Sequence, residues 1–349
     1  MQNSIIRTAT ALAGCILIAA GCIQRSSIVP DGRPISFSAG TSLLRDDATK
    51  GTIKEGPLFD NGDKISVFGW HAGSQTLEFD DQPVEYGAGS WSYSPVRSWE
   101  WQAGEDYYDF LAIYRYQTAP PHPSTVTSPR LIVSQPYYIA DDYDLMMAGV
   151  RREHDEADRN RVVPLVFQHM CSAVKVVVYN DSQTTDFTLD AYKFKNIPSQ
   201  ATARAQINAG NVVYGWTGAQ RMAGTELGGA DGIDQTLTHG SAAPGYTGDY
   251  EMMIPAALDE ELGTGTGNWP ELILRYTKEG GVQEETEVKL KDICLLGANE
   301  EETQVPLLQW ERGVKYIYRI HLKLDGGIVV HVQTTDWEVV EAETPGLLI

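Results

Sequence analysis

The sequence predicts an all-β protein. Short runs rich in Val, Ile, Tyr, Trp and Phe recur along the 349 residues and are separated by Gly, Pro, Asp and Asn, a pattern typical of strands joined by turns. No stretch of a dozen residues combines a clean helical period with caps at both ends. The chain is longer than one core usually accommodates, so we expect two antiparallel β-sandwich domains in tandem.

Residues 1–21 have the features of a secretory signal peptide: Arg7 in a short polar start, then an almost unbroken apolar run that ends in Ala19-Ala20-Gly21. The run is too short for a permanent membrane-spanning helix, which needs about 20 apolar residues. Small residues directly before Cys22 predict lipoprotein processing, with Cys22 acylated at the start of the mature chain. Cleavage before Cys15 would leave an apolar core of only about five residues. The alternative is an ordinary secreted protein.

Composition limits the classes of function. The formal net charge of −20 argues against nucleic acid as a partner, because nucleic-acid binding requires a basic face. It suits solubility outside the cell. Cys171 and Cys294 both lie in apolar, strand-like segments, and either a disulfide or two buried free thiols would fit them.

In the first half, five segments define the expected elements. Ile35–Ala39 alternates as a short first strand should, and Asn61-Gly62-Asp63 is a turn before the strand Lys64–Trp70. Tyr108–Tyr116 is an apolar and aromatic strand that stops at the loop Pro120–Pro123.

A charged stretch without aromatic residues lies between Ala148 and Pro164 and is typical of a surface connection. We place the domain boundary there. It contains four side chains of the metal-ligating type, but their spacing fits neither a calcium loop nor a zinc helix, and we interpret the segment as a solvated linker: Glu153, His154, Asp155 and Asp158.

The second half opens with a strong strand, Pro164–Asn180, and contains a Gly-rich region at 208–249 that we expect to form loops around weak strands. It ends with the clearest hairpin: Lys315–Leu324, the turn Asp325-Gly326-Gly327, and a return strand at 328–332. One face of its first strand is apolar, as a sandwich requires: Tyr316, Tyr318, Ile320, Leu322 and Leu324.

No motif of catalysis is present in the sequence: there is no phosphate-binding glycine loop, no G-x-S-x-G and no H-E-x-x-H. The seven histidines are scattered. His321 and His331, on the two arms of the terminal hairpin, could approach each other but are more simply polar surface positions, and His169 is expected to be hydrogen-bonded in the core. We therefore predict no catalytic residue, no metal site and no cofactor, and a protein that is not an enzyme.

Several segments, in order along nearly the whole mature chain, resemble the fimbrillin family of the Bacteroidetes. The matching segments are Ile35–Gly40, Phe59 with Gly62–Phe68, the tryptophans Trp91, Trp99 and Trp101 leading into Tyr108–Tyr114, Asp144–Ala148, Pro164–His169, and Trp310 with Gly313–Tyr316, Leu322 and Trp337. The resemblance implies two transthyretin-like β-sandwich domains and a lipoprotein-exported pilus subunit.

The resemblance also implies a mechanism of assembly. Such pilins are cut by a trypsin-like protease after an Arg or Lys, lose their first strand, and accept a strand of the next subunit in the groove that opens. Arg45, in a polar stretch directly after the first strand, is the preferred processing site, and Lys50 is the second candidate. The alternative is that both are ordinary loop cations and the first strand stays in place, as in anchor or tip subunits.

The expected strand donor is the C-terminal tail, which starts at Trp337-Glu338-Val339-Val340 and ends in Gly346, Leu347, Leu348 and Ile349. Exposed apolar residues usually find a partner, which favours a tail that pairs with another subunit. The alternative is that the tail pairs within its own domain.

We thus expect a signal peptide at 1–21, a first-strand and processing segment at 22–50, and sandwich domains at 51–160 and 161–349. The expected function is that of a structural pilus subunit, lipid-anchored in the outer membrane and surface-exposed. Its partners would be other pilus subunits of the same or related chains, and host or bacterial surface ligands. Residues Ile23–Ser27 lack the acidic residues that often follow the lipidated cysteine in surface lipoproteins of this phylum. The rivals are a non-polymerising anchor or tip adhesin, and a glycan-binding surface lipoprotein that stacks sugars on Trp70, Trp91, Trp99 or Trp101.

Overall fold

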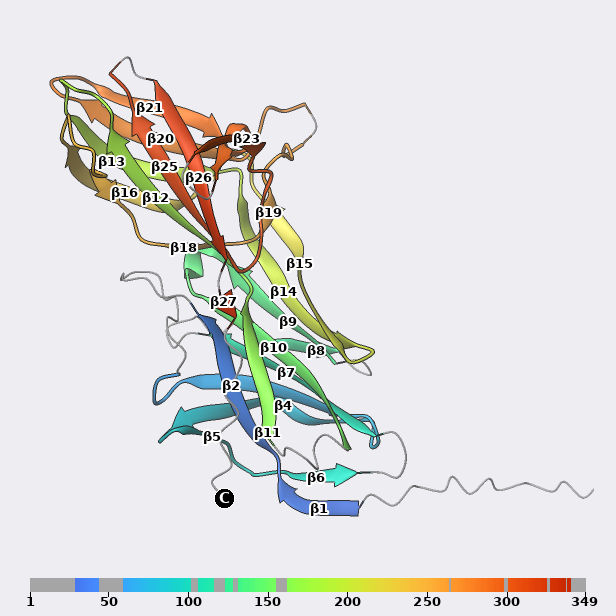
Figure 1. Ribbon diagram of the computed structural model, residues 1–349. Helices are drawn as coiled ribbons and strands as arrows, with labels where there is room; N and C mark the ends of the chain where they lie inside the picture. Colours follow the sequence, from blue (N-terminus) through green and yellow to red (C-terminus); the bar gives the residue numbers. More distant parts are fainter. Residues whose placement is uncertain are drawn as a thin grey trace, which may run out of the picture.

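The computed structural model describes residues 29–43, 59–101, 106–115, 123–127, 131–154, 162–263, 265–297, 301–324, 327–336 and 338–339. These residues are mostly in β-strands, with two single-turn 3-10 helices, η1 (Ile139–Asp141) and η2 (Leu290–Asp292). The molecule is elongated, and its two halves are stacked end to end (Figure 1). The all-β prediction is confirmed.

The N-terminal half is built around one large sheet whose strands run in the order β27-β2-β11-β10-β7-β3-β4-β5. Their bounds are β27 (Glu338–Val339), β2 (Ser36–Leu43), β11 (Val162–His169), β10 (Leu145–Glu153), β7 (Tyr107–Arg115), β3 (Lys64–His71), β4 (Thr76–Gly87) and β5 (Ser90–Ser92). A second sheet contains β15 (Asn211–Arg221), β14 (Pro198–Asn208), β9 (Ile132–Tyr138) and β8 (Thr125–Thr127), and a ribbon pairs β1 (Val29–Pro34) with β6 (Ser98–Trp101). In the large sheet all pairs are antiparallel except β2 and β11, which are parallel.

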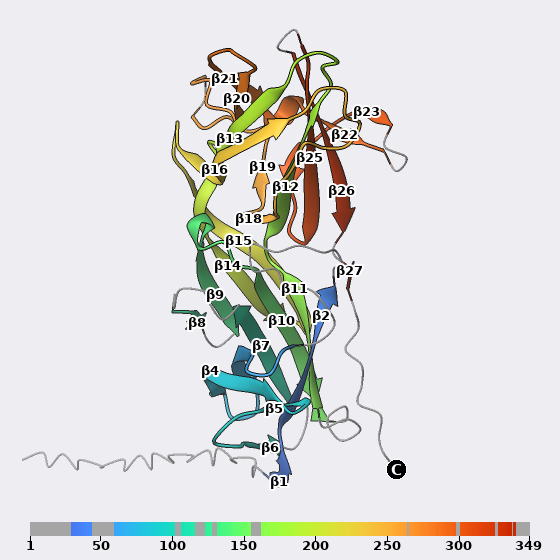
Figure 2. The ribbon, with the colours of Figure 1, turned by 90° about the vertical axis from the view of Figure 1, so that its left-hand side faces the viewer.

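The C-terminal half is a sandwich of two sheets (Figure 2). One contains β17 (Tyr246–Thr247), β12 (Ser172–Asn180), β25 (Val314–Leu322), β26 (Ile328–Asp336), β22 (Cys294–Leu296) and β23 (Glu302–Pro306), with β18 (Glu251–Met253) also on β12. The other contains β16 (Glu226–Leu237), β13 (Phe187–Lys195), β20 (Glu271–Lys278) and β21 (Gln283–Lys289). A small ribbon pairs β19 (Ala256–Ala257) with β24 (Gln309–Trp310).

Three clusters of buried apolar side chains hold these layers together. One lies between the two sheets of the C-terminal half. The other two cover opposite faces of the large N-terminal sheet: Phe110 and Ala112 of β7 belong to one, and Leu111 and Ile113 to the other. Because both of its faces are buried, β7 is a nearly continuous apolar run instead of an alternating one.

Most of the expected strands form. The segments predicted at 35–39, 64–70 and 108–116 lie largely in β2, β3 and β7, and the terminal hairpin forms from β25 and β26. The expected inward face of β25 is buried, with the exception of Leu324, which lies beyond the strand and is 55% exposed.

Two expectations about elements are wrong. Residues 164–180 are two strands instead of one, because the chain leaves the N-terminal sheet at Met170, whose N–H donates to Leu145 O at 2.8 Å, and enters the C-terminal sheet after Cys171. The Gly-rich region forms two of the longest strands, β15 and β16, whose glycines accommodate irregular register instead of ending the strand.

Strand pairing does not follow the division expected at 160/161. β11 and β14 come after this point in the sequence, yet they pair with β10, β2 and β9, and β15 joins the same half through β14. The charged stretch from Ala148 is also strand as far as Glu153, which corrects its interpretation as a surface connection. The division into 51–160 and 161–349 stays a prediction. In the described ranges no helix has the length and apolar character needed to cross a membrane.

Candidate functional site

The strand β2 lies along the side of the large N-terminal sheet, next to β11 (Figure 1). From Ser36 to Thr41 it pairs in parallel with Val162–Phe167. Over this stretch no strand in the described part of the chain pairs with its other edge, because β27 pairs only with Ser42 and Leu43 at its end. β2, which contains most of the first strand expected from the sequence, is therefore an edge strand over most of its length.

The side chains at the start of β2 are part of the core. Ile35 and Phe37 are 2% and 5% exposed, and Ala39 packs partly buried against the same cluster. The ring of Phe37 makes edge contacts with Phe79 and Phe110, at centroid distances of 5.6 and 5.8 Å. The segment alternates as predicted, and the structure shows that positions 35, 37 and 39 are the inward ones.

Backbone hydrogen bonds anchor the beginning of this strand. The Ile35 N–H donates to Arg97 O at 2.8 Å, and the Tyr93 hydroxyl donates to Ile35 O at 2.8 Å. Burial raises the pKa of Tyr93, so the hydroxyl keeps its proton and remains a donor. Just before Ile35, β1 pairs with β6.

A cavity of about 260 Å³ lies beside the point where β1 meets β2. Ile35 lines it together with Arg97 and Glu78, whose charged groups are 3.7 Å apart, and with the ring of Tyr108. The wall of this cavity is thus built partly by the first strand itself.

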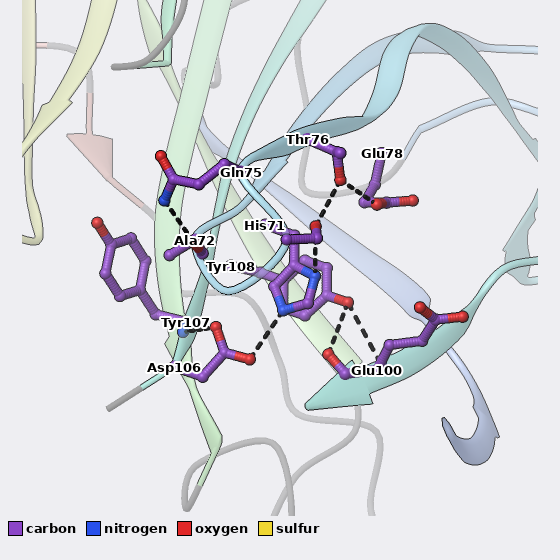
Figure 3. Close-up of polar contacts among 10 residues, drawn as sticks. His71, Ala72, Gln75, Thr76, Glu78, Glu100, Asp106, Tyr107 and Tyr108 are labelled. Atoms are coloured by element: carbon purple, nitrogen blue, oxygen red, sulfur yellow. Dashed lines mark hydrogen bonds and ion pairs between the residues drawn. The ribbon is translucent and has the colours of Figure 1, made fainter. Parts of the chain in front are cut away.

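A polar cluster lies behind the cavity, at the β3–β4 turn (Figure 3). Its centre is His71, which is fully buried: Nε2 lies 2.8 Å from Oδ2 of Asp106, and Nδ1 lies 2.9 Å from Oγ of Ser74. The ring of Tyr108 stacks on His71 at 4.2 Å, and its hydroxyl donates to Glu100 O at 3.0 Å.

The order Ser74, His71, Asp106 superficially resembles a catalytic relay, but its surroundings assign it a structural role. The Ser74 hydroxyl is held in the turn by Thr76, at 2.5 Å, and Thr76 in turn donates to Glu78. The cluster ties the β3–β4 turn to the start of β7 and, through Tyr108 and Glu100, to β6, the partner of β1.

The site residues expected from the sequence lie outside the described residues: Cys22, Arg45, Lys50, Gly346, Leu347, Leu348 and Ile349. The structure places the start of the expected donor tail. Glu338 and Val339 form β27 and pair with the end of β2 of the same chain, as in the alternative of a tail that pairs within its own subunit.

Other expected side chains can be placed. Trp70, Trp99 and Trp101 are buried, and Trp91 packs partly buried on Phe59 at 4.8 Å. Sugar stacking on Trp70, Trp99 and Trp101 is therefore excluded in the folded chain.

Cys171 and Cys294 are free thiols, and burial raises the pKa of Cys171. His169 is hydrogen-bonded to Asp144 at 2.9 Å in the core, as expected. His321 and His331 do not pair with each other, because they contact Asp181 and Glu302.

Sequence reasoning missed Tyr93 and the His71 cluster. Their partners are distant in sequence: Tyr93 bonds to Ile35, 58 residues away, and His71 to Asp106, 35 residues away. The available signal for Tyr93 was its position between Ser92 and Ser94, because alternation with polar residues marks an inward-facing aromatic position.

A family model described as fimbrillin-like matches residues 48–337 of the chain. The chain belongs to the fimbrillin-like family. The match covers both halves of the fold, and it confirms the family resemblance of the sequence. Membership makes this fimbrillin-like chain a fimbrial subunit or adhesin of the cell surface, in a family that is structural and adhesive.

Several solved structures are similar to this chain at low sequence identity. A fimbrial protein from Bacteroides vulgatus ATCC 8482 is 12% identical, with 86% of this chain and 99% of that chain covered and a TM-score of 0.53. A candidate cell adhesion protein from Bacteroides uniformis ATCC 8492 is 15% identical, with 88% and 100% covered and a TM-score of 0.47. The tip fimbrial protein Mfa3 from Porphyromonas gingivalis, with C-terminal truncation, is 14% identical, with 80% and 95% covered and a TM-score of 0.39. A search of the curated proteins found no match.

Proposed function

We propose that this fimbrillin-like chain is a structural subunit of a surface pilus that assembles by β-strand exchange. It is exported as a lipoprotein acylated at Cys22, which anchors it in the outer membrane. Cleavage after Arg45, or after Lys50, then separates the first strand from the rest of the chain. The partner that fills the vacated position is another pilus subunit.

The observation that carries this proposal is the position of β2. An edge strand can leave a sheet without disturbing pairs on both of its sides, whereas a central strand cannot. In the described chain β2 is hydrogen-bonded mainly to β11. Both expected cleavage positions follow it in the sequence, outside the described residues. A single cut there would make β2 a separate peptide held only by non-covalent contacts.

Another strand would have to fill the groove that β2 leaves. Departure of the strand exposes the backbone groups of β11 and the apolar pockets of Ile35 and Phe37, whose burial contributes about 3–6 kcal/mol in total. An extended segment with apolar side chains at alternate positions satisfies both needs. The tail offers Leu347 and Ile349 at such a spacing.

The test is limited trypsin treatment of the purified Ile23–Ile349 chain, followed by mass spectrometry and an unboiled denaturing gel. We expect one early cut, after Arg45 or Lys50, and a ladder of detergent-resistant multimers. Arg45→Gln and Lys50→Gln, made separately, identify the position. Lys64→Gln is the matched control, because Lys64 has an exposed side chain but lies in a paired strand.

Deletion of Gly346–Ile349 tests the donor role of the tail separately from the opening of the acceptor groove. The truncated chain should be cut as before and remain folded, but form no ladder. A normal ladder from this variant would contradict a donor role of the tail. A clean cut with monomer alone in the full chain would contradict self-assembly and favour an anchor subunit or a tip adhesin.

A further inference from the structure

A second cavity, of about 280 Å³, lies where the two halves meet and is independent of the first strand. The turn after η1, which belongs to the N-terminal half, provides Asp142 to its lining, and β18 of the C-terminal half provides Glu251 and Met252. Figure 2 shows β18 at this junction. Its volume is close to that of small-molecule sites in proteins.

The walls of this junction cavity are aromatic. Tyr192, Tyr246 and Tyr250 line it, and the rings of Tyr192 and Tyr246 are tilted against each other at a centroid distance of 6.1 Å. Ile139 and Met252 add apolar surface. Aromatic rings around a small cavity favour an organic cation, because the face of each ring carries partial negative charge.

The charged groups of the lining are all acidic. They are Asp142, Asp249 and Glu251, and no lysine, arginine or histidine is among the described lining residues. Three cations lie nearby and have partners of their own: Lys193 forms an ion pair with Asp231 at 2.7 Å, and Lys175 and Lys315 lie over the ring of the lining residue Tyr250 at 5.2 and 4.5 Å.

Two of the carboxylates are held in place by hydrogen bonds. Oε1 of Glu251 accepts from the Tyr192 hydroxyl at 2.8 Å, its Oε2 accepts from the Gly229 N–H, and Oδ1 of Asp142 accepts from the Met252 N–H at 3.0 Å. Asp249 makes no hydrogen bond or ion pair with the described part of the chain. Its carboxylate is available to a ligand.

The wall formed by β16 requires glycine. Gly228 and Gly229 both have positive φ, at 59° and 74°, and a Cβ on Gly229 would come within 2.1 Å of Tyr192 O. The register between β13 and β16 shifts at the same place, between Tyr192 and Phe194. An irregularity of this kind directs neighbouring groups away from the regular ladder, and here it directs the Gly229 N–H to Glu251.

We propose that the junction cavity binds an alkylammonium or guanidinium group of the size of a lysine or arginine side chain. Three carboxylates supply the charge and acceptors, and the tyrosine rings surround the alkyl part. A metal ion fits less well, because no group of three His, Cys, Asp or Glu side chains in the described chain is arranged to hold one. A neutral sugar would leave the acidic charge uncompensated.

The proposal is tested by isothermal titration calorimetry at low salt on the full Ile23–Ile349 chain. The probes are N-acetyl-lysine methylamide, its uncharged analogue N-acetyl-norleucine methylamide, and n-pentylamine. We expect the lysine probe to bind at least about tenfold more tightly than the norleucine probe. Tighter binding of the lysine probe than of pentylamine assigns the cavity to a partner protein, and the reverse assigns it to a free amine.

Variants locate the binding. Asp249→Asn and Glu251→Gln should each weaken the lysine probe by about fivefold or more, and Asp249→Asn keeps the test valid if Glu251→Gln disturbs the fold. Glu284→Gln on the outer sheet is the control and should leave binding unchanged. Equal affinity for the lysine and norleucine probes would overturn the proposal. So would binding of calcium ions or methyl glucoside without binding of the lysine probe.

Discussion

Burial decides how Glu251 ionises. Desolvation, followed by the nearby charge of Asp142, raises the pKa of this carboxyl above its ordinary value of 4.5, although the Gly229 N–H and the Tyr192 hydroxyl oppose the shift. A carboxyl whose pKa is higher in the folded than in the unfolded chain stabilises the fold below the unfolded pKa. This contribution is lost as pH rises through the folded pKa.

The first prediction concerns this residue. Relative to the natural chain, the free energy of unfolding of Glu251→Gln should be lower at about pH 4 and higher at about pH 7. The reason is that glutamine does not have to ionise in a partly buried place as pH rises. Urea unfolding at both pH values measures the difference. Glu284→Gln is the control, and its stability relative to the natural chain should change with pH in the opposite direction, since Lys278 lowers the pKa of Glu284. A Glu251→Gln effect that is independent of pH would contradict the assignment.

At the residue scale, the sequence predicts the burial of a side chain better than it predicts the hydrogen-bond partners of that side chain. The inward face of β25 and the buried position of His169 followed from alternation and from apolar neighbours. The partners did not, because Asp144 and His169 meet only when β10 and β11 pair. The charge crowding at Glu251 was equally hidden, since its neighbour Asp142 is 109 positions earlier in an unrelated loop.

The element that matters most is β2, whose contacts are few enough to be tested singly. Phe37→Ala should lower the free energy of unfolding by about 3–5 kcal/mol, because a buried phenylalanine leaves a cavity that the neighbouring rings fill only in part. Ser38→Ala on the same strand is the matched control, with a side chain on the opposite face.

Amide hydrogen exchange provides a more local measurement of the same change. In the Phe37→Ala chain the amides of Val162–Phe167 that bond to β2 should lose protection before those in the middle of β7, since an edge strand opens locally. Equal destabilisation by Phe37→Ala and Ser38→Ala would show that β2 does not depend on its core contacts.

At the element scale, errors came from places where the chain changes partners. Residues 164–180 form one strand-like, mostly apolar run. It is divided between two sheets at Met170 and Cys171, because β11 pairs with β10 and β12 pairs with β25. Nothing in the local sequence marks such a division. In the Gly-rich region, glycine at positive φ produces bulges in β16, so composition indicated loops where pairing with β13 maintains a strand.

At the scale of the whole molecule, the buried core joins side chains that lie far apart in the sequence. One buried cluster joins Leu111 and Met147 of the N-terminal half to Ala203 of β14 and to Met252 of β18. The N-terminal half is therefore completed by strands that come late in the chain.

It follows that a fragment ending at residue 160 should not fold. Residues 23–160 lack β11, β14 and β15, which would expose one face of β7 and leave β10 as an unpaired edge. We expect no cooperative thermal transition by circular dichroism, in contrast to the full chain. A well-dispersed amide spectrum from this fragment would support the boundary expected from the sequence.

At this scale the sequence predicted fold class and family, because both depend on features distributed over the chain. It could not predict which strands complete which half, because that depends on long-range pairs such as β9 with β14. For the candidate site, alternation at Ile35, Phe37 and Ala39 predicted the inward face. The parallel partner β11 and the neighbour β27 emerged only from the topology.

The direction of β2 has a mechanical consequence. β2 and β11 extend along the length of the N-terminal half (Figures 1 and 2). Tension on the ends of a strand in this position, applied along its length, loads its row of backbone bonds in shear and together, whereas a sideways pull would peel them off one at a time. A joint made here would therefore be strongest against stretching along the long axis and weakest against tearing across it.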